Sequence, residues 1–289
     1  MDNPINFLGV RRICFMLSTA LILGGVGSLI VHKGPNLGID FRGGVEIVAK
    51  FNEPTSVSDA AATLEAAGVS GAQIVSSKDN TLLINAVVQE SGTGQKIVAA
   101  LKASHNLADS KIREVGANVG QDLQVAGILM IVVALGLILI YISLRFQWRF
   151  AVGAVVALIH DVLITLGVFS VMNLEINLPT LAAFLTVVGY SINDTIVVFY
   201  RIRENQRILR GMRLTDLINT SITQMLRRTL LTSLTTLGVV ALIFWQSVAG
   251  ELRTFALALV IGVVVGTYSS IYIASPVMMF LRPRAVTGD

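Results

Sequence analysis

The chain has 289 residues, of which 54% are hydrophobic and 14% are charged, and its mean hydropathy is +0.73. This composition excludes an ordinary soluble globular domain and indicates a polytopic membrane protein. The net charge of +4 comes largely from arginines at the ends of apolar segments, so it indicates membrane topology and gives no case for nucleic-acid binding.

Six apolar segments are long enough to cross about 30 Å of hydrocarbon as helices. They are Ile13 to Val31, Leu123 to Leu144, Phe150 to Met172, Pro179 to Tyr200, Leu230 to Val248, and Phe255 to Leu281. The last segment is expected to include a short interfacial turn around Pro276.

The first span is expected to be an uncleaved signal anchor. Arg11 and Arg12 precede it and resemble a twin-arginine export signal, but the apolar run that follows lacks a convincing small-residue cleavage site. The single cysteine, Cys14, lies in this span, so no internal disulfide can form.

The remaining arginines near span ends predict how the chain is threaded. They are Arg145, Arg149, Arg201, Arg203, Arg207, Arg210, Arg213, Arg227, Arg228, Arg282 and Arg284. With six spans, all of them and the Arg11–Arg12 pair fall on one side of the membrane. The positive-inside rule therefore places both termini in the cytoplasm.

The hydrophilic region from His32 to Gln121, between the first and second spans, predicts a small folded domain outside the cytoplasm. Strands are expected at 41–51, 72–77, 81–88 and 112–119, helices at 56–67 and 94–104, and a hairpin turn across Lys78, Asp79 and Asn80. Ser56, followed three residues later by Asp59, is typical of a helix start. The order βαββαβ is that of the ferredoxin-like α+β fold.

No nucleotide site is expected in this external region. Gly92 to Lys96 resembles a phosphate-binding loop only superficially, because the spacing GxxxxGK[ST] is missing. No Walker motif occurs elsewhere, so any work that the protein performs must draw on another energy source. No cofactor and no metal site are predicted.

Small residues recur every four positions on three of the spans. They are Gly262, Gly266, Ser270 and Ala274 in the sixth span, Gly153 and Ala157 in the third, and Ala20, Gly24 and Ser28 in the first. Such faces let helix backbones approach closely, so they predict tight packing within the bundle or contacts with helices of a partner protein.

Asp161 follows His160 in the middle of the third span. Adjacent helix residues point about 100° apart, so the pair is not expected to chelate one metal ion. A structural role for Asp161 is favoured over a place in a proton relay. An intramembrane aspartyl protease with Asp161 and Asp194 as its dyad is excluded by the absence of the GxGD signature.

Asp194 is the most informative residue of the membrane part. A charged residue at mid-membrane costs about 2.5 to 3.5 kcal/mol on insertion scales, and such residues usually face a bundle interior, a partner charge or a water-filled path. Tyr190 and Ser191 lie at i−4 and i−3, so their hydroxyls are expected to share its helix face, with Asn193 beside it in sequence.

Arg228 begins a second polar stripe, which continues with Thr232 and with Thr235 or Thr236 and is expected to point inward from the cytoplasmic edge. Burial disfavours a charged Asp194, whereas a nearby guanidinium favours it. If the stripes face each other, a movable Arg228 could switch Asp194 between proton uptake and release. The alternative is that Arg228 anchors the helix at the interface and Asp194 is a structural hydrogen-bonding residue.

Five blocks of sequence resemble the SecF family, the smaller membrane subunit of the SecD/SecF protein-export accessory complex. They are GIDFRGG (38–44), RFQWR (145–149) leading to ALIHDV (157–162), VVGYSINDTIVVFYRIREN (187–205), RRTLLTSLTT (227–236) and GTYSSIYIASP (266–276). The likeness covers nearly the whole chain, although the first block is shared with SecD.

The resemblance implies a fold similar to that of resistance-nodulation-division (RND) exporters and a complex that helps preproteins leave the SecYEG channel. It implies that protons moving down their gradient drive this step, with Asp194 and Arg228 matching the family's relay residues. SecD is then a separate polypeptide that supplies a further relay aspartate.

Two positions depart from the family's pattern. Tyr200 stands where an aspartate is common before RIREN, and Gln147 replaces the usual acidic residue of RFxWR. Both positions are expected at the cytoplasmic boundary, where they alter any local charge network and leave Asp194 untouched.

The sequence thus predicts an α-helical membrane protein of six spans with an external ferredoxin-like domain. Its expected parts are residues 1–31 (cytoplasmic N-terminus and first span), 32–121 (external domain), 122–281 (the other five spans) and 282–289 (cytoplasmic tail). Two alternatives to a proton-driven translocation subunit stay open: a scaffold that stabilises SecD and the channel without conducting protons, and an RND-type exporter of small molecules.

Overall fold

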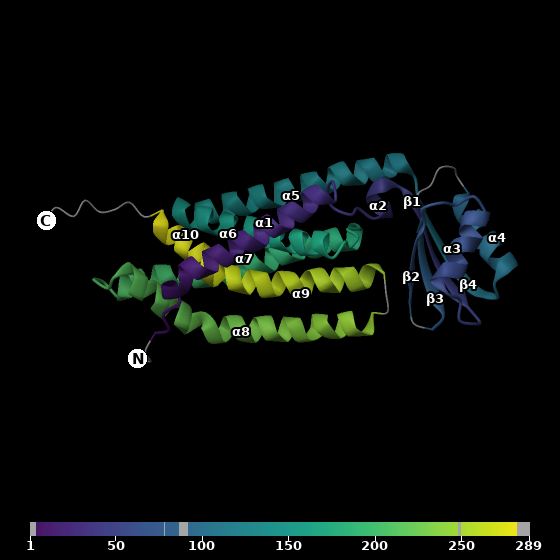
Figure 1. Ribbon diagram of the computed structural model, residues 1–289. Coiled ribbons are helices and arrows are strands. Elements are labelled where there is room, and N and C mark those ends of the chain that lie inside the picture. The colour runs from purple at the N-terminus through teal and green to yellow at the C-terminus, as the bar shows by residue number, and fades with distance from the viewer. Residues whose placement is uncertain (1–3, 78, 87–91, 248–249, 282–289) are drawn as a thin grey trace.

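The computed structural model describes residues 4–77, 79–86, 92–247 and 250–281. Six long apolar helices form a bundle, and a four-stranded sheet with two covering helices stands at one end of it (Figure 1). This confirms the predicted fold class. The predicted tail 282–289, the turn residue Lys78 and the strand end 87–88 lie outside the described residues.

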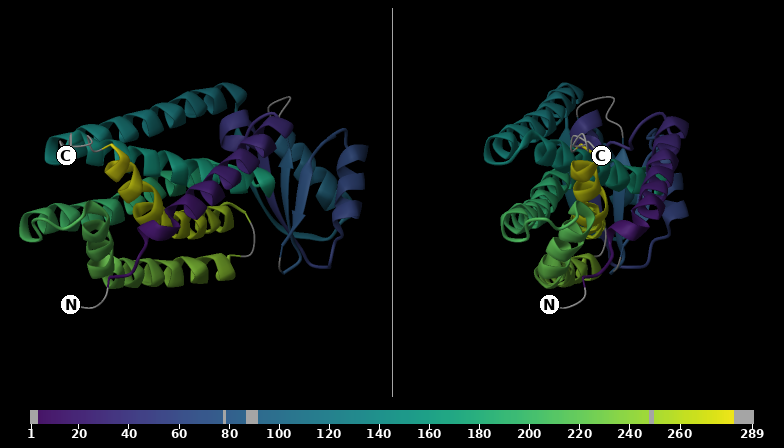
Figure 2. Two further views of the ribbon diagram at one scale, coloured as in Figure 1. Left: turned by 60° about the vertical axis from the view of Figure 1, so that its left-hand side comes forward. Right: turned by 90° about the vertical axis from the view of Figure 1, so that its left-hand side faces the viewer.

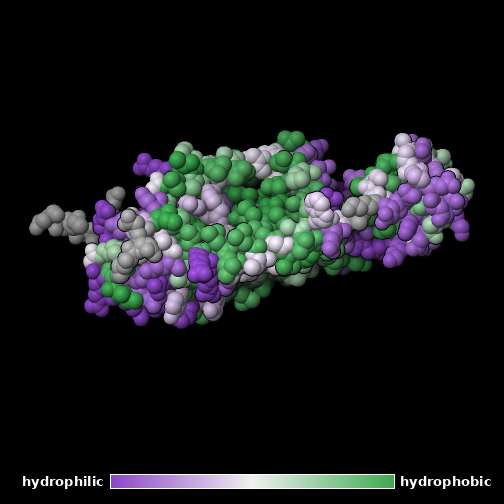
Figure 3. All heavy atoms as spheres, turned by 90° about the horizontal axis from the view of Figure 1, so that it is seen from below, coloured by the Kyte–Doolittle hydropathy of each residue, from purple (hydrophilic) through white to green (hydrophobic). Residues whose placement is uncertain are grey.

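Three helices form the centre of the bundle and three lie outside it. The central ones are α6 (Trp148–Val171), α7 (Leu178–Ile208) and α9 (Glu251–Ser269), and the outer ones are α1 (Arg11–Val31), α5 (Ala117–Arg145) and α8 (Leu214–Gln246). Two views of the ribbon show α5 and α8 along opposite sides (Figure 2). The outer helices leave most of their apolar side chains exposed, and Figure 3 shows the resulting hydrophobic surface between more hydrophilic ends.

Two helices extend well beyond the predicted apolar spans. α7 continues past Tyr200 to Ile208, and α8 begins at Leu214 and not at Leu230. Hydropathy marks only the stretch that crosses hydrocarbon, whereas backbone hydrogen bonds carry a helix on into polar sequence.

The turn expected around Pro276 is absent from the described chain, so that prediction was wrong. α9 continues through a π-helical segment, Ser270–Ala274, directly into α10 (Ser275–Phe280). Pro276 lacks a backbone N–H and lies in the first turn of α10, and the Ser275 hydroxyl donates to the Ser270 carbonyl at 3.1 Å. A widened helical turn therefore accommodates the proline without breaking the helix.

Glycines allow the helices to approach closely. A Cβ on Gly25 would lie 2.7 Å from the Cα of Gly167, so α1 and α6 cross with their backbones in contact. Of the predicted face of α1, Ser28 lies 2.8 Å from the Ser170 hydroxyl of α6, whereas Gly24 has nothing within 4 Å and the closest approach falls on Gly25. Gly262 and Gly266 pack against side chains of α7, in agreement with the predicted small-residue face of α9.

The external part has the predicted order βαββαβ. Its elements are β1 (Gly44–Phe51), α3 (Val57–Ala66), β2 (Gln73–Ser76), β3 (Thr81–Ala86), α4 (Thr93–Ser104) and β4 (Leu107–Val115). The sheet is antiparallel with strand order β2-β3-β1-β4, and Ile47 of β1 pairs with Ile84 on one side and Ile112 on the other.

The two faces of the sheet have different partners. Val45, Ile47 and Ala49 alternate along β1 and are buried with residues of α3 and α4, which cover one face. The other face, which carries Glu46, is turned toward the membrane bundle (Figure 1). As predicted, Ser56 caps α3 by accepting a hydrogen bond from the Asp59 amide at 3.1 Å.

Two strands were predicted with wrong boundaries. Phe41 belongs to a short helix, α2 (Ile39–Arg42), because its side chain packs against the outer end of the bundle and Gly43 then turns the chain at φ +75°. The last strand begins at Leu107 and not at Ile112, and it ends at Val115, because residues 117–119 already belong to the polar first turns of α5.

Candidate functional site

Asp194 lies near the middle of α7 and is only 3% exposed. Its Oδ2 atom is buried and has no hydrogen-bond partner among the described residues. The neighbouring Thr195 hydroxyl is buried and unpartnered in the same way. Unsatisfied buried polar atoms are rare in proteins, and a buried carboxylate oxygen is a costly one.

Arg228 of α8 is exposed and forms no direct ion pair with Asp194 in the described structure. Its positive charge nevertheless acts on the Asp194 carboxylate across the α7–α8 contact. The described structure therefore shows no closed salt bridge between these two residues, and their pairing stays a prediction.

The predicted inward stripe of α8 is rotated by one residue. Thr232 and Thr236 donate their hydroxyls to carbonyls of their own helix, Thr232 to Arg228 at 3.1 Å and Thr236 to Thr232 at 2.9 Å. In the part of α8 beyond Arg228, the buried polar residues are instead Thr229, at 2% exposure, and Ser233. Thr229 has a buried hydroxyl without a partner, as Asp194 and Thr195 do.

Tyr190 bridges three helices beside Asp194. Its hydroxyl donates to Ser233 of α8 at 3.2 Å, and Ser233 lies 2.7 Å from the Thr267 hydroxyl of α9. Asn193 faces outward and is exposed, with no hydrogen bond in the part of the chain that the structure describes. Of the residues expected around Asp194, Tyr190 thus lies within the bundle and Asn193 on its surface.

Asp161 of α6 is completely buried and fully hydrogen-bonded. His160 Nδ1 lies 2.9 Å from its Oδ1, and its Oδ2 accepts from Ser191 of α7 at 2.5 Å and from Ser269 of α9 at 2.8 Å. Ser191 therefore turns to Asp161 and not to Asp194, contrary to the shared face expected from its spacing.

Hydrogen bonds extend this centre to the outer helix α1. His160 Nε2 lies 2.9 Å from the Ser18 hydroxyl, which lies 3.0 Å from the Tyr268 hydroxyl of α9. Tyr268 also donates to the Cys14 carbonyl at 2.8 Å. The chain of contacts holds four helices together, and no group of three potential metal ligands occurs among the described residues.

The two buried carboxylates therefore differ in kind. Asp161 has three side-chain partners, which suits a fixed structural tie. Asp194 keeps an unpartnered oxygen within the field of an arginine, and the buried hydroxyls of Thr195 on the same helix and Thr229 on α8 also lack partners among the described residues. An arrangement of that kind can take up and release a proton or hold water without first breaking protein hydrogen bonds.

The GIDFRGG segment fastens the external part to the outer end of α7. Gly38 donates its amide to the Ile176 carbonyl at 2.7 Å, and Asp40 Oδ2 accepts from the Leu178 amide at 2.8 Å, at the first residue of α7. Gly43 and Gly44 both have positive φ, and a Cβ on Gly43 would lie 2.7 Å from the Ala117 Cα at the start of α5. Only glycine fits such a close left-handed turn.

Arg113 of β4 is the second part of this joint between the external part and the bundle, and the sequence analysis did not predict it. It lies 3.4 Å from Asp40, 3.2 Å from Glu46 and in direct contact with Glu251, the first residue of α9. The available signal was Asp40, an acidic residue inside GIDFRGG to which no role had been given. Burial raises the pKa of Glu46, because it outweighs the opposing charge of Arg113.

A cavity of about 430 Å³ lies beside this joint, between the sheet and the outer ends of α7, α8 and α9. Glu175, from the connection before α7, accepts two hydrogen bonds there from the Asn85 amide of β3, at 3.1 and 2.9 Å. The sheet is thus linked by side chains to the connection before α7 and to the first residue of α9, two of the three central helices.

Comparison with known families matches two parts of the chain. Residues 95–284 match the family described as "Protein export membrane protein SecD/SecF, C-terminal", and residues 28–55 match the family "SecD/SecF GG Motif". The second match contains Asp40, Gly43 and Gly44, the residues of the joint at the outer end of α7.

Comparison with individual proteins gives the same family along the whole chain. The Vibrio alginolyticus protein translocase subunit SecF is 43% identical over 287 residues, which cover 97% of this chain and 90% of that protein. The crystal structure of SecDF, a translocon-associated membrane protein from Thermus thermophilus, matches with a TM-score of 0.86 at 36% identity, over 96% of this chain and 39% of that one. SecDF in its super-membrane-facing form matches with a TM-score of 0.70 at 34% identity, over 97% of this chain and 39% of that one.

Proposed function

Since the chain belongs to the SecF family of protein translocase subunits, we propose that it forms the proton-carrying SecF half of a complex that promotes late steps of preprotein translocation through the Sec channel. The proton motive force drives this step. The observation that carries the proposal is the buried Asp194 carboxylate with its unpartnered oxygen.

Asp194 and Arg228 form the proton switch. When Asp194 is charged, attraction draws Arg228 toward it across the α7–α8 contact, and when Asp194 is protonated this attraction disappears. A proton that crosses the membrane supplies about 2.3 kcal/mol per 100 mV, which is enough to bias a conformational equilibrium of a few kcal/mol. The unpartnered hydroxyls of Thr195 and Thr229 provide hydrogen-bonding sites for water along the path.

The external sheet receives the motion through the ends of the central helices. α7 carries Asp194 and is capped by Asp40, and α9 begins at Glu251, which contacts Arg113 of β4. A tilt or shift of either helix is therefore transmitted to the sheet through charged contacts. The unequal similarity to the two solved SecDF forms supports more than one arrangement of this fold.

SecD is the partner that completes the proton path. The match with the Thermus SecDF chain covers 96% of the present chain but only 39% of the SecDF chain. The rest of that SecDF chain corresponds to SecD, which we propose as the partner of the present chain. The outward face of α7 carries Thr186, Gly189 and Asn193, which are exposed. An amide at mid-membrane needs a hydrogen-bonding partner, and a SecD helix on this face supplies one.

The complex acts at the bacterial cytoplasmic membrane, beside the SecYEG channel. The arginine-rich end of the bundle lies opposite the sheet, so the positive-inside rule puts both termini in the cytoplasm and the sheet on the external side. There the external part meets the preprotein as it leaves the channel. Proton movement replaces ATP, which is not available on that side.

A scaffold role without proton conduction is the second candidate. It is favoured by the fully satisfied Asp161 centre, which ties four helices together, and by the long apolar faces of α1, α5 and α8. An RND-type small-molecule exporter has weaker support, because such a protein needs a larger substrate-binding external part than the described sheet and its two helices.

The test is export of a model preprotein by vesicles that contain SecYEG, SecD and either the wild-type chain or Asp194→Asn, with and without a proton gradient. Asp216→Asn serves as the matched control, because Asp216 is a surface residue paired with Arg213 at 2.8 Å. Copurification with SecD checks assembly. Asp194→Glu tests whether a carboxylate at this place restores activity.

We expect Asp194→Asn to lose the gradient-dependent component of export while the complex remains intact. Asp216→Asn should keep that component, and Asp194→Glu should recover part of it. Gradient-dependent export by the intact Asp194→Asn complex at the wild-type rate would refute the relay and favour the scaffold.

A further inference from the structure

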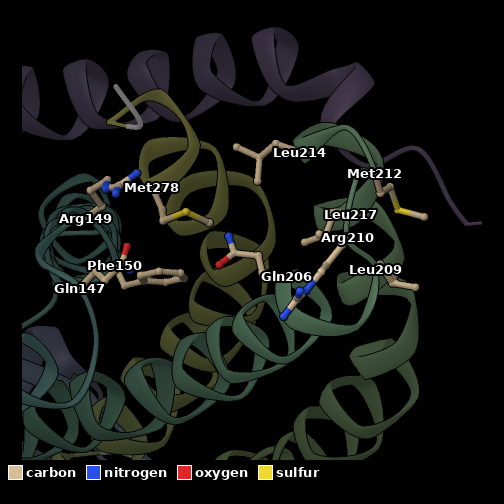
Figure 4. A pocket seen from close by; sticks show the side chains of 11 residues that line it. Gln147, Arg149, Phe150, Gln206, Leu209, Arg210, Met212, Leu214, Leu217 and Met278 are labelled. Atoms are coloured by element: carbon tan, nitrogen blue, oxygen red, sulfur yellow. The ribbon is translucent and has the colours of Figure 1, made fainter. Parts of the chain in front are cut away.

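A second cavity, of about 330 Å³, lies at the end of the bundle opposite the sheet. It is enclosed by the first residues of α6, the end of α7, the α7–α8 connection, the first turns of α8, and α10 (Figure 4). Neither Asp194 nor Arg228 lines this cavity, and the sequence patterns did not predict it.

The charged residues that line this cavity are both arginines. Arg149 and Arg210 contribute to its wall, and no Asp or Glu occurs among its described lining residues. Figure 4 shows Gln206 between them in projection, so an amide accompanies the two guanidinium groups. The wall therefore offers many hydrogen-bond donors and two positive charges.

One of these donors is buried without a partner in the described part of the chain. The Nε atom of Arg149 is buried and makes no hydrogen bond, and Arg210 forms no ion pair there. By contrast, Arg201 pairs with Glu204 at 2.6 Å at the same end of the bundle. A buried guanidinium nitrogen without an acceptor costs free energy unless an external anion supplies one.

The start of α6 adds to the positive potential. The helix begins at Trp148, and its N-cap residue Gln147 lines the cavity without making a side-chain capping bond. The free amides and the dipole at a helix N-terminus attract anions, phosphate above all. Two arginines and a helix N-terminus thus act on one small space.

The remaining wall is apolar. Phe150, Leu217 and Met278 line the cavity and belong to a buried hydrophobic cluster. Trp148, beside the cavity, is 56% exposed, as expected of a tryptophan at the membrane–water interface. A site with basic donors, apolar walls and an interfacial position suits a phosphate group that carries an apolar portion.

We infer that this cavity binds the phosphate group of an anionic phospholipid from the leaflet on the arginine-rich side. Arg149 and Arg210 hold the phosphate oxygens, and the apolar wall accepts the first part of the glycerol and acyl portion. A soluble phosphate compound shares the same anionic chemistry, so the experiment has an arm for each source.

Trp148 provides a fluorescent reporter beside the site. The chain contains two tryptophans, so Trp245→Phe leaves Trp148 as the single emitter. In this background, quenching is measured in bilayers that contain equal fractions of brominated phosphatidylglycerol or brominated phosphatidylcholine. The same measurement is made with Arg149→Gln and Arg210→Gln together, and thermal unfolding confirms that the variant is folded.

The double variant Arg207→Gln with Arg12→Gln is the matched control. It also removes two positive charges, and neither residue lines this cavity. Both double variants remove two positive charges and therefore lose the same general attraction to an anionic surface. The pocket variant also loses the charge-assisted hydrogen bonds to the phosphate, which are worth about tenfold each, so it should lose about 100-fold more selectivity for phosphatidylglycerol than the control. An equal loss in both double variants would overturn the site, since the attraction would then be a general effect of surface charge.

Inorganic phosphate and glycerol phosphate distinguish the source. If the site takes lipid, neither compound at millimolar concentration reverses the phosphatidylglycerol quenching, and neither raises the unfolding temperature. If either one displaces the lipid or stabilises only the protein with both pocket arginines, the assignment to lipid is overturned and a soluble phosphate compound takes its place. Equal quenching by both brominated lipids in the wild type also contradicts the proposal.

Discussion

The carboxylate of Asp40 caps the helix that carries Asp194, because its Oδ2 accepts the Leu178 amide at 2.8 Å. Asp40 also faces Arg113 of the external sheet at 3.4 Å. One side chain therefore belongs to the external part, to the start of α7 and to the charged joint between them.

Replacement of Asp40 should weaken this joint. We expect Asp40→Ala to lower the free energy of unfolding by about 1 to 2 kcal/mol, because the hydrogen bond to the first amide of α7 and an ion-pair partner of Arg113 are lost together, while the N-cap Asn177 remains. Thermal unfolding of the purified protein measures the change. Glu53→Ala, at an exposed position of the external part, is the control and should have little effect.

Glu46 should make the stability of the joint depend on pH. Burial raises its pKa in the folded protein, so protonation favours the folded form. The stabilising contribution is complete below the ordinary carboxyl pKa of about 4.3 and is lost as the pH rises through the raised folded value. Arg113, Glu251 and Glu175 are the charged groups that act on Glu46.

We therefore expect Glu46→Gln to be more stable than the wild type at neutral pH, with a difference that shrinks as the pH is lowered toward 4. Unfolding temperatures measured across this range test the sign. Glu65→Gln, on the exposed side of α3, should run parallel to the wild type at each pH. A gap that widens on acidification would mean that the charged form of Glu46 is the stabilising one.

The crossing of α1 and α6 should tolerate a side chain at one glycine and not at its neighbour. Gly25→Val is expected to cost about 1 to 3 kcal/mol, because its Cβ would lie 2.7 Å from the Gly167 backbone. Gly24→Val meets nothing within 4 Å and carries the same intrinsic effect of valine in a helix. Unfolding in detergent compares the two, and equal stability would show that the helices do not cross here.

The two buried aspartates should respond to amidation in opposite ways. Asp161→Asn should destabilise the bundle by about 1 to 3 kcal/mol, because Ser191, Ser269 and His160 all bind the carboxylate. Asp194→Asn should leave stability unchanged or raise it, because an unpartnered buried carboxylate is costly. A large loss of stability in Asp194→Asn would assign it a structural role.

Much of this architecture could be predicted from the sequence, because the strongest signals are local. Long apolar runs gave the six spans, and Ser56 with Asp59 gave the start of α3. Phe41 was assigned to a strand because a single apolar residue between polar ones resembles the alternation of a strand. Its side chain is apolar for another reason, since it is buried against the bundle.

Helix rotation was the part that sequence could not supply. Ser191 was expected beside Asp194 and binds Asp161, and the inward face of α8 runs through Thr229 and Ser233 and not through Thr232. A shift of one residue turns a helix face by about 100°, and neighbouring helices decide it. The joint around Arg113 was missed for the same reason, because its partners come from distant parts of the chain.

The hydrogen bonds from α1 to later helices also bear on the order of synthesis. α1 is made before α6 and α9, yet Ser18 contacts His160 of α6 and Tyr268 of α9, and Tyr268 donates to the Cys14 carbonyl, so these bonds form only after α9 has been made. Lipid tails are as apolar as the face of α1, so these polar contacts and the glycine crossing are what hold it in place. A nascent chain that stops before α9 leaves His160 and Asp161 with part of their partners, and the finished bundle is the first state in which every one of these bonds can form.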